Sequence, residues 1–263
     1  MGVKRWIEGK RSMERKRIAI VTGASSGMGR EFVRQIDRHT KTLDEIWVAA
    51  RRKDRLLALQ SEITNVPIRI LEMDLCQSAD LDNLADLLEE EKPAVRILVN
   101  AAGVGKAGYF HELSRKEVEQ MVCLNDKALA VVTHIVIPYM TRPGNIIQIA
   151  SASAFLPQKE FAVYAASKAF VLSFSRALHA ELREKGIVVT AVCPGPVDTE
   201  FLALCNEGKE QKPSKQLVTV RPEPVVAKAL RDAKSGRELS VYGLPMKMVH
   251  LASKFLPHSF LLH

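Results

Sequence analysis

The chain has 263 residues, of which 47% are hydrophobic. This length and composition fit one large α/β domain with a sizeable core, and they argue against a disordered or fibrous chain. The net charge is +8, but seven Lys and Arg residues lie before position 18. No recognition motif accompanies this charge, so we expect no nucleic-acid partner.

The N-terminus and the cysteines bear on the compartment. We expect residues 1–16 to form a basic, flexible extension, with either Met1 or Met13 as the true start. The segment lacks the apolar stretch of a secretory signal, and the longest apolar run, residues 128–140, is too short for a membrane span. Four cysteines occur without metal-type spacing, which favours free thiols, no bound metal and a cytoplasmic protein.

The first predicted strand, Ile18–Val21, runs directly into the glycine-rich segment TGASSGMG, Thr22–Gly29, and helical periodicity follows. A strand, a glycine turn and a helix in this order let the backbone approach a pyrophosphate at the helix N-terminus. A tight turn without a ligand is the simpler alternative. The spacing is G-x-x-x-G-x-G, which differs from the G-x-G-x-x-G of many dinucleotide folds.

The second predicted strand, Ile46–Ala49, is followed by Arg51 and Arg52. In a dinucleotide site the residue that ends this strand meets the adenosine ribose. An acid there binds the 2′-hydroxyl of NAD, whereas arginine accommodates the 2′-phosphate of NADP. The pair therefore favours NADP over NAD, although a solvated basic start of a helix would look the same.

Two more strands are predicted at Ile68–Leu71 and Val95–Val99. Asp74 and Leu75 follow the first of them, and NAAG, Asn100–Gly103, ends the second. The small residues of NAAG allow a flat ligand to approach closely.

A helix is predicted from Ser114, where Glu117 completes a capping-box pattern, to Pro138. Its long apolar stretch indicates a buried or subunit-contacting helix. Asn125 lies inside it. A buried amide needs partners, so Asn125 is either a satisfied core residue or a functional one, and the residues alone favour the core.

The fifth predicted strand, Asn145–Ala150, ends at Ser151, where ligands of open α/β sheets bind. The next helix carries YAASK, Tyr164–Lys168, and stops at Gly186. Residues four apart on a helix share a face, so Tyr164 and Lys168 should project into one site. A nearby cation lowers the pKa of a phenol from about 10 and makes it a proton donor and acceptor. A helix that merely contains one Tyr and one Lys is the alternative.

The sixth predicted strand, Ile187–Cys193, leads into PGPVDTEF, Pro194–Phe201. Repeated alternation of strand and helix over residues 17–243, with no linker, predicts a single α/β domain. Its doubly wound parallel sheet should have about seven strands, with helices on both faces.

The last part of the chain is harder to interpret. Residues 200–223 form a substrate-loop region that either closes over substrate or is a surface insertion. A helix at Pro224–Ala233 and a strand at Leu239–Tyr242 complete the sheet. The apolar and basic tail, residues 244–263, could cover the pocket, pack on a partner subunit or lie on a membrane surface. Packing on its own protein is the favoured of the three.

TGASSGMG, NAAG, Asn125, Ser151, YAASK and PGPVDTEF, in this order, resemble the short-chain dehydrogenase/reductase family from about Arg17 to Tyr242. The resemblance implies a Rossmann-type fold. It implies that Tyr164 is the acid in carbonyl reduction and the base in alcohol oxidation. It further implies that Lys168 lowers the pKa of Tyr164 and binds the nicotinamide ribose. Ser151 would then hydrogen-bond the substrate oxygen, and Asn125 would hold a water of a proton relay.

The resemblance also implies a cofactor site built from the diphosphate turn, the 2′-phosphate contacts, the adenine and ribose contacts and the nicotinamide contacts. In chain order these residues are Gly23, Ser25, Ser26, Gly27, Met28, Gly29, Arg51, Arg52, Asp74, Leu75, Asn100, Ala101, Gly103, Tyr164, Lys168, Pro194, Gly195, Val197 and Thr199. Many NADP-using members have a basic residue where this chain has Ser26. The NADP preference therefore depends on Arg51 and Arg52.

The leading interpretation is an NADP-dependent oxidoreductase that transfers a hydride between nicotinamide and a ketone or secondary alcohol of apolar, steroid-like or acyl character. Apolar residues expected near the site are Phe155, Leu156, Val197, Phe201 and Leu202. A 3-oxoacyl carrier-protein reductase of fatty-acid synthesis and a non-catalytic NADP-binding sensor are the alternatives. The resemblance implies a homodimer or homotetramer formed through the helices that carry Asn125 and Tyr164.

Overall fold

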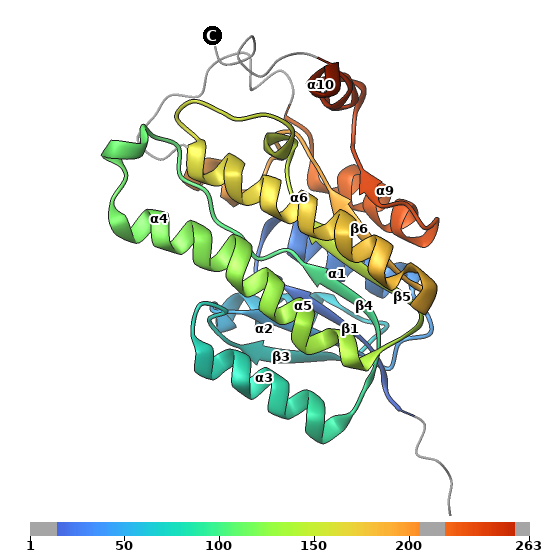
Figure 1. The fold of residues 1–263 in the computed structure, drawn as a ribbon. Coiled ribbons are helices and arrows are strands. Elements are labelled where there is room, and N and C mark those ends of the chain that lie inside the picture. The colour runs from blue at the N-terminus through green and yellow to red at the C-terminus, as the bar shows by residue number, and fades with distance from the viewer. Residues whose placement is uncertain (1–14, 206–218, 256–263) are drawn as a thin grey trace, which may run out of the picture.

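The structure, a computed structural model, describes residues 15–205 and 219–255. Most of the predicted N-terminal extension, the middle of the substrate-loop region and the end of the tail lie outside these residues. One sheet of seven parallel strands has the order β3-β2-β1-β4-β5-β6-β7 (Figure 1). The strands are β1 (Arg17–Thr22), β2 (Glu45–Ala50), β3 (Ile68–Glu72), β4 (Ala94–Asn100), β5 (Met140–Ile149), β6 (Ile187–Val192) and β7 (Leu239–Ser240).

Alternate residues of each strand enter two separate cores, because successive side chains of a strand point to opposite faces. Ala19 and Val21 of β1 belong to one core, and Ile18 and Ile20 belong to the other. Burial on both faces makes these strands continuous apolar runs, which is why the sequence predicts them well. Helices α1 (Gly27–His39), α2 (Lys53–Glu62) and α9 (Pro222–Lys234) cover the first core, and α3 (Ser78–Glu91), α5 (Leu129–Val136) and α6 (Ala162–Leu182) cover the second (Figure 1).

The strand order reverses direction at β1, which pairs with β2 on one side and β4 on the other. The connections after β1 and β4 therefore leave toward opposite edges and open a crevice beyond the carboxyl ends of the strands. The doubly wound α/β prediction is confirmed, and the crevice lies where ligands of such sheets bind.

The helix predicted from Ser114 forms as a continuous element. It comprises α4 (Arg115–Val122), a π turn η2 (Cys123–Ala128), α5 and a 3₁₀ turn η3 (Ile137–Tyr139). Ser114 and Glu117 make the predicted capping box. In the described part of the chain, this helix alone is long and apolar enough to cross a membrane by length and composition. Its Ala128, Val132 and Val136 are fully buried in the core, and α5 contacts β4, so this part of the helix packs in the core.

Two strands have a boundary that differs from the prediction by more than one residue. β5 begins at Met140, five residues early, because Met140 pairs with Val95 beyond a register shift in β4. β7 has only two residues, because the chain turns at Gly243 (φ +83°) into helix α10 (Leu244–Phe255). The remaining elements are η1 (Phe110–Glu112), η4 (Ala152–Phe155), η5 (Arg183–Lys185) and α7 (Glu200–Cys205).

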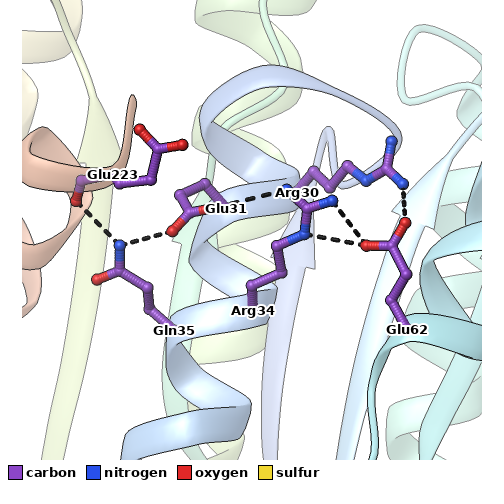
Figure 2. Close-up of polar contacts among 6 residues, drawn as sticks. All are labelled: Arg30, Glu31, Arg34, Gln35, Glu62 and Glu223. Carbon is purple, nitrogen blue, oxygen red and sulfur yellow. Dashed lines mark hydrogen bonds and ion pairs between the residues drawn. The ribbon is translucent and has the colours of Figure 1, made fainter. Parts of the chain in front are cut away.

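A polar cluster fixes α1 between α2 and α9, and Figure 2 shows its side chains. Arg34 bonds Glu62 of α2 at 2.7 Å, and Arg30 contacts the same carboxylate. On the other side, Gln35 Nε2 donates to Glu31 at 2.7 Å and to the Glu223 carbonyl of α9 at 2.9 Å. Since α1 starts in the glycine turn, these contacts hold that turn in place.

Candidate active site

A cavity of about 940 Å³ lies beyond the carboxyl ends of the strands. Its wall includes the glycine turn, the segments after β2 to β6, the start of α6, helix α7 and one face of α10. All of the residues that the sequence predicted for catalysis and cofactor binding line it, except Asn100 and Asn125. The fold therefore gathers segments more than 170 residues apart in the sequence around one space.

The glycine turn has no room for side chains. A Cβ on Gly23, which has φ +67°, would lie 2.6 Å from the Ala102 backbone nitrogen. A Cβ on Gly29 would lie 2.3 Å from the Gly23 carbonyl oxygen. Ser26 caps α1 without a side-chain hydrogen bond, so no side-chain cap engages the N–H groups of the first turn. These features fit a pyrophosphate, which binds helix N-termini through backbone N–H groups.

The two arginines after β2 lie at the rim next to this turn. Arg51 is largely exposed and lies 4.0 Å from Asp74. Arg52 reaches over the turn, where Nη2 donates to Ser26 Oγ at 2.9 Å and to Ser25 Oγ at 3.2 Å. Two guanidinium groups beside the turn fit a dinucleotide that carries an additional phosphate.

Glu200 is a partner of Arg52 that the sequence analysis did not single out. Arg52 Nη1 donates to both carboxylate oxygens at 2.9 and 3.0 Å, and Arg55 donates to one of them at 2.6 Å. Hydrogen bonds from these two arginines lower the pKa of Glu200 to about 2. The acid follows Thr199 directly in PGPVDTEF, but nothing local indicates that it faces two arginines 148 and 145 residues away.

Tyr164 and Lys168 project into the cavity from adjacent turns of α6, as their spacing predicts. The Tyr164 ring lies 4.4 Å from the Phe161 ring and 5.7 Å from the Phe201 ring, measured between centroids. Gly105 allows this packing, because a Cβ there would lie 3.0 Å from the Tyr164 ring and 2.8 Å from Cys205 Sγ. Two aromatic rings therefore pack against the phenol ring.

Burial controls the protonation of both groups. It raises the pKa of the Tyr164 phenol, and a hydrogen bond with Ser151 opposes that shift. It lowers the pKa of Lys168 to about 8, although Asp126 favours the charged form. The prediction that the cation lowers the pKa of Tyr164 is wrong for this structure. Lys168 Nζ instead donates to the Ile149 carbonyl at 2.8 Å and lies 5.7 Å from the Tyr164 ring centroid.

Two predicted residues are in the core and not in the cavity wall. Asn100, expected beside the adenosine ribose, donates to Thr133 Oγ1 at 2.9 Å and to Gln148 Oε1 at 3.0 Å. Asn125 accepts from the Val104 N–H and donates to the Val104 carbonyl, each at 2.9 Å. The Asn125 amide also donates to Ser167 Oγ at 3.0 Å. The amide therefore joins the segment after β4 to α6, and the water-relay role that the family resemblance implies for Asn125 stays a prediction.

Of the apolar residues that the sequence places near the substrate, some line the cavity and one is buried in the core. Leu156, Val197, Phe201 and Leu202 line the cavity, whereas Phe155 is buried beneath it against His250. The sequence analysis left the role of the tail open. Met246 and Val249 of α10 complete the cavity wall, so part of the tail covers the pocket.

Known proteins share both the sequence pattern and the fold. The family model described as short chain dehydrogenase matches residues 17–210. An uncharacterized oxidoreductase of Staphylococcus epidermidis is 28% identical over 200 residues, which cover 75% of this chain and 85% of that protein.

Two solved structures align with most of the chain. A short-chain dehydrogenase from Sphingobium yanoikuyae in complex with NADPH is 28% identical with a TM-score of 0.78, covering 90% of this chain and 93% of that one. The bulky-bulky ketone specific alcohol dehydrogenase from Comamonas testosteroni is 28% identical with a TM-score of 0.73, covering 90% and 91%. From the family match over most of its length and from this fold, the chain belongs to the short-chain dehydrogenase family and is an oxidoreductase with a nicotinamide cofactor.

Proposed function

We propose that this protein is an NADP-dependent oxidoreductase that transfers a hydride between nicotinamide and an apolar ketone or secondary alcohol. One observation carries the proposal: a single cavity has Ser151, Tyr164 and Lys168 in its wall together with Arg51 and Arg52 at its rim. The first group suits proton transfer at an oxygen, and the second suits a phosphate.

The bound dinucleotide supplies or accepts the hydride. In the proposal, the Tyr164 hydroxyl gives its proton to the carbonyl oxygen during reduction and takes it back during oxidation. Ser151 donates a hydrogen bond to the same oxygen and stabilises the charge that develops there. Burial raises the pKa of Tyr164, so the phenol carries its proton at neutral pH and can donate it to the carbonyl oxygen. Lys168 would orient the cofactor ribose.

The NADP preference rests on Arg51 and Arg52, and it is supported by the NADPH complex of the Sphingobium relative. Arg51→Asp should weaken NADPH binding more than NADH binding, because it places an acid near the 2′-phosphate and leaves the rest of the dinucleotide site intact. An unchanged preference between the two cofactors, measured by fluorescence titration, would show that Arg51 is only a surface residue.

The apolar character of the substrate rests on the wall formed by Leu156, Phe201, Leu202, Met246 and Val249. The Comamonas relative is named for bulky ketones, which agrees with this wall. The same wall would also accept an acyl chain. We therefore expect oxidation of NADPH with steroid-like or other bulky ketones and little with sugars; activity confined to carrier-protein thioesters would favour a 3-oxoacyl reductase.

Tyr164→Phe tests the mechanism directly. It should abolish turnover while NADPH binding stays close to that of the wild type, because the ring and its packing remain and only the proton is lost. Phe161→Leu is a matched control, since it alters the ring next to the phenol but removes no proton. A Tyr164→Phe variant with normal kcat would rule out the proposed role, and a wild-type protein that binds NADPH but reduces no carbonyl would favour a sensor.

We also propose that the protein is a cytoplasmic homo-oligomer joined through the helices of Asn125 and Tyr164. Val122 on α4 and Phe170 on α6 are large apolar side chains left exposed, and the two helices contact each other. Analytical ultracentrifugation of wild type and of Val122→Glu with Phe170→Glu tests this. A monomeric wild-type protein at micromolar concentration would refute it.

A further inference from the structure

Helix α10 leaves a row of large apolar side chains exposed. Leu244, Met248, Leu251 and Phe255 are 72%, 57%, 52% and 77% exposed. They account for four of the ten large apolar residues that the described part of the chain exposes. Their spacing of four, three and four residues places them along one face of the helix. We call these four residues the outer stripe.

The opposite face of α10 is held against the protein, so the outer stripe cannot turn inward. Met246 lies against the PGP segment, where a Cβ on Gly195 would come within 2.8 Å of its sulfur. The His250 ring packs on Phe155 at 4.4 Å, and Val249 lines the cavity. In Figure 1, α10 lies at the periphery of the molecule, above α6 and α9. The helix is therefore a wall of the pocket on one side and an apolar surface on the other.

The charged side chains on the helix beside the outer stripe are all positive. Lys247 and Lys254 are exposed and seven residues apart, so both flank the same edge of the stripe. The chain has no acidic residue after Glu238, and Glu238 itself is paired with Arg176 at 2.9 Å. Burial lowers the pKa of His250, and the positive charges of Lys254 and Arg176 lower it further.

We propose that α10 seats the protein on an anionic lipid bilayer, with the outer stripe in the acyl boundary and Lys247 and Lys254 at the headgroups. Interfacial helices have this arrangement of leucine and phenylalanine on one face with lysine beside it. A second copy of the chain fits less well. Two α10 helices packed together would bring four lysines close to one another, and neither helix has an acidic residue to offset their repulsion. The helix that supplies Met246 and Val249 to the cavity wall would then lie on the membrane.

Flotation of the full chain with vesicles tests the proposal. Vesicles of phosphatidylcholine with phosphatidylglycerol should carry the protein, vesicles of phosphatidylcholine alone should carry much less, and added salt should release it. Met248→Gln with Phe255→Gln should abolish binding, since both side chains point outward and the variant keeps the pocket face. Lys247→Gln with Lys254→Gln should weaken binding by about fivefold for each lysine. Leu57→Gln, an exposed apolar residue on α2, is the matched control and should bind normally.

Hydrogen exchange keeps the test independent of how the variants fold. In the wild-type protein, residues 244–255 should gain protection when phosphatidylglycerol vesicles are added, and residues 53–62 of α2 should not. Absence of vesicle binding would overturn the proposal. So would binding that the outer-stripe variant retains, or protection of α10 that follows protein concentration in the absence of lipid, which would identify a second copy as the occupant.

Discussion

Lys168→Met should make the protein more stable while it removes turnover. Lys168 is 4% exposed, and burial lowers its pKa from the ordinary 10.5 to about 8. One pKa unit corresponds to about 1.4 kcal/mol, so keeping this ammonium protonated in the folded protein at pH 7 costs about 3 kcal/mol. Met removes that cost but also the hydrogen bond to the Ile149 carbonyl, which contributes about 1 kcal/mol. The expected net gain at pH 7 is about 2 kcal/mol.

The pH dependence of the stability difference shows whether the buried ammonium of Lys168 causes it. Below pH 8 the folded and unfolded chains both carry the proton, so the wild-type protein bears the full cost. Between pH 8 and 10.5 the folded chain releases the proton while the unfolded chain keeps it, so wild-type stability rises with pH. The advantage of Lys168→Met should therefore be largest below pH 8 and should shrink toward pH 10.5.

Urea unfolding of wild type and variant at pH 7, 8.5 and 10 measures this difference, because titrations common to both proteins cancel. Lys234→Met, at the exposed end of α9, is the control and should change stability by less than about 0.5 kcal/mol at each pH. A variant that is less stable than wild type at pH 7, or a difference that does not vary with pH, would refute the burial argument.

Three further changes test other parts of the site. Gly29→Ala should weaken NADPH binding by about tenfold or more, because its Cβ would meet the Gly23 carbonyl at 2.3 Å and open the turn; unchanged binding in a titration would show that the turn is not used. Glu200→Gln should tighten NADPH binding by about threefold and leave NADH binding unchanged, since it removes a negative charge near the proposed phosphate site. Burial raises the pKa of Asp126 to about 6, so Asp126→Asn should stabilise the protein by about 1 kcal/mol above pH 6, and urea unfolding should show that the gain fades as pH falls toward 4.

The parts of the fold that sequence predicts well are those whose cause is local. The buried strands are apolar runs, and the capping box at Ser114 needs only Glu117 three residues on. Gly186 ends its helix at φ +69°, which few other residues adopt. Each signal acts within a few residues, so no tertiary information is needed to read it.

The predictions that differ from the structure depend on contacts between residues far apart in the sequence. Asn100 belongs to a motif at a ligand-binding edge, yet its side chain bonds Thr133 and Gln148, which are 33 and 48 residues away. The motif places the backbone at the edge but does not say which face of the sheet its side chains enter. The prediction for the pKa of Tyr164 was wrong for a similar reason. The spacing puts Lys168 nearby, but desolvation sets the direction of the shift, and desolvation comes from the surrounding fold.

Arg52 combines a position that the sequence predicts with partners that only the fold brings together. The sequence places it correctly at the rim, but its partners decide what it can do. Nη1 is used by Glu200, while Nε and Nη2 are used by Ser25 and Ser26, so a phosphate that binds Arg52 must replace some of these bonds. The serine hydroxyls are neutral and are weaker competitors than the carboxylate, because charged pairs form the stronger hydrogen bonds. A phosphate should therefore take the serine side of the guanidinium and leave the Glu200 side engaged. Since Glu200 begins the helix that places Phe201 against Tyr164, the arginine that we propose for the 2′-phosphate would also anchor the side of the cavity that carries these two rings.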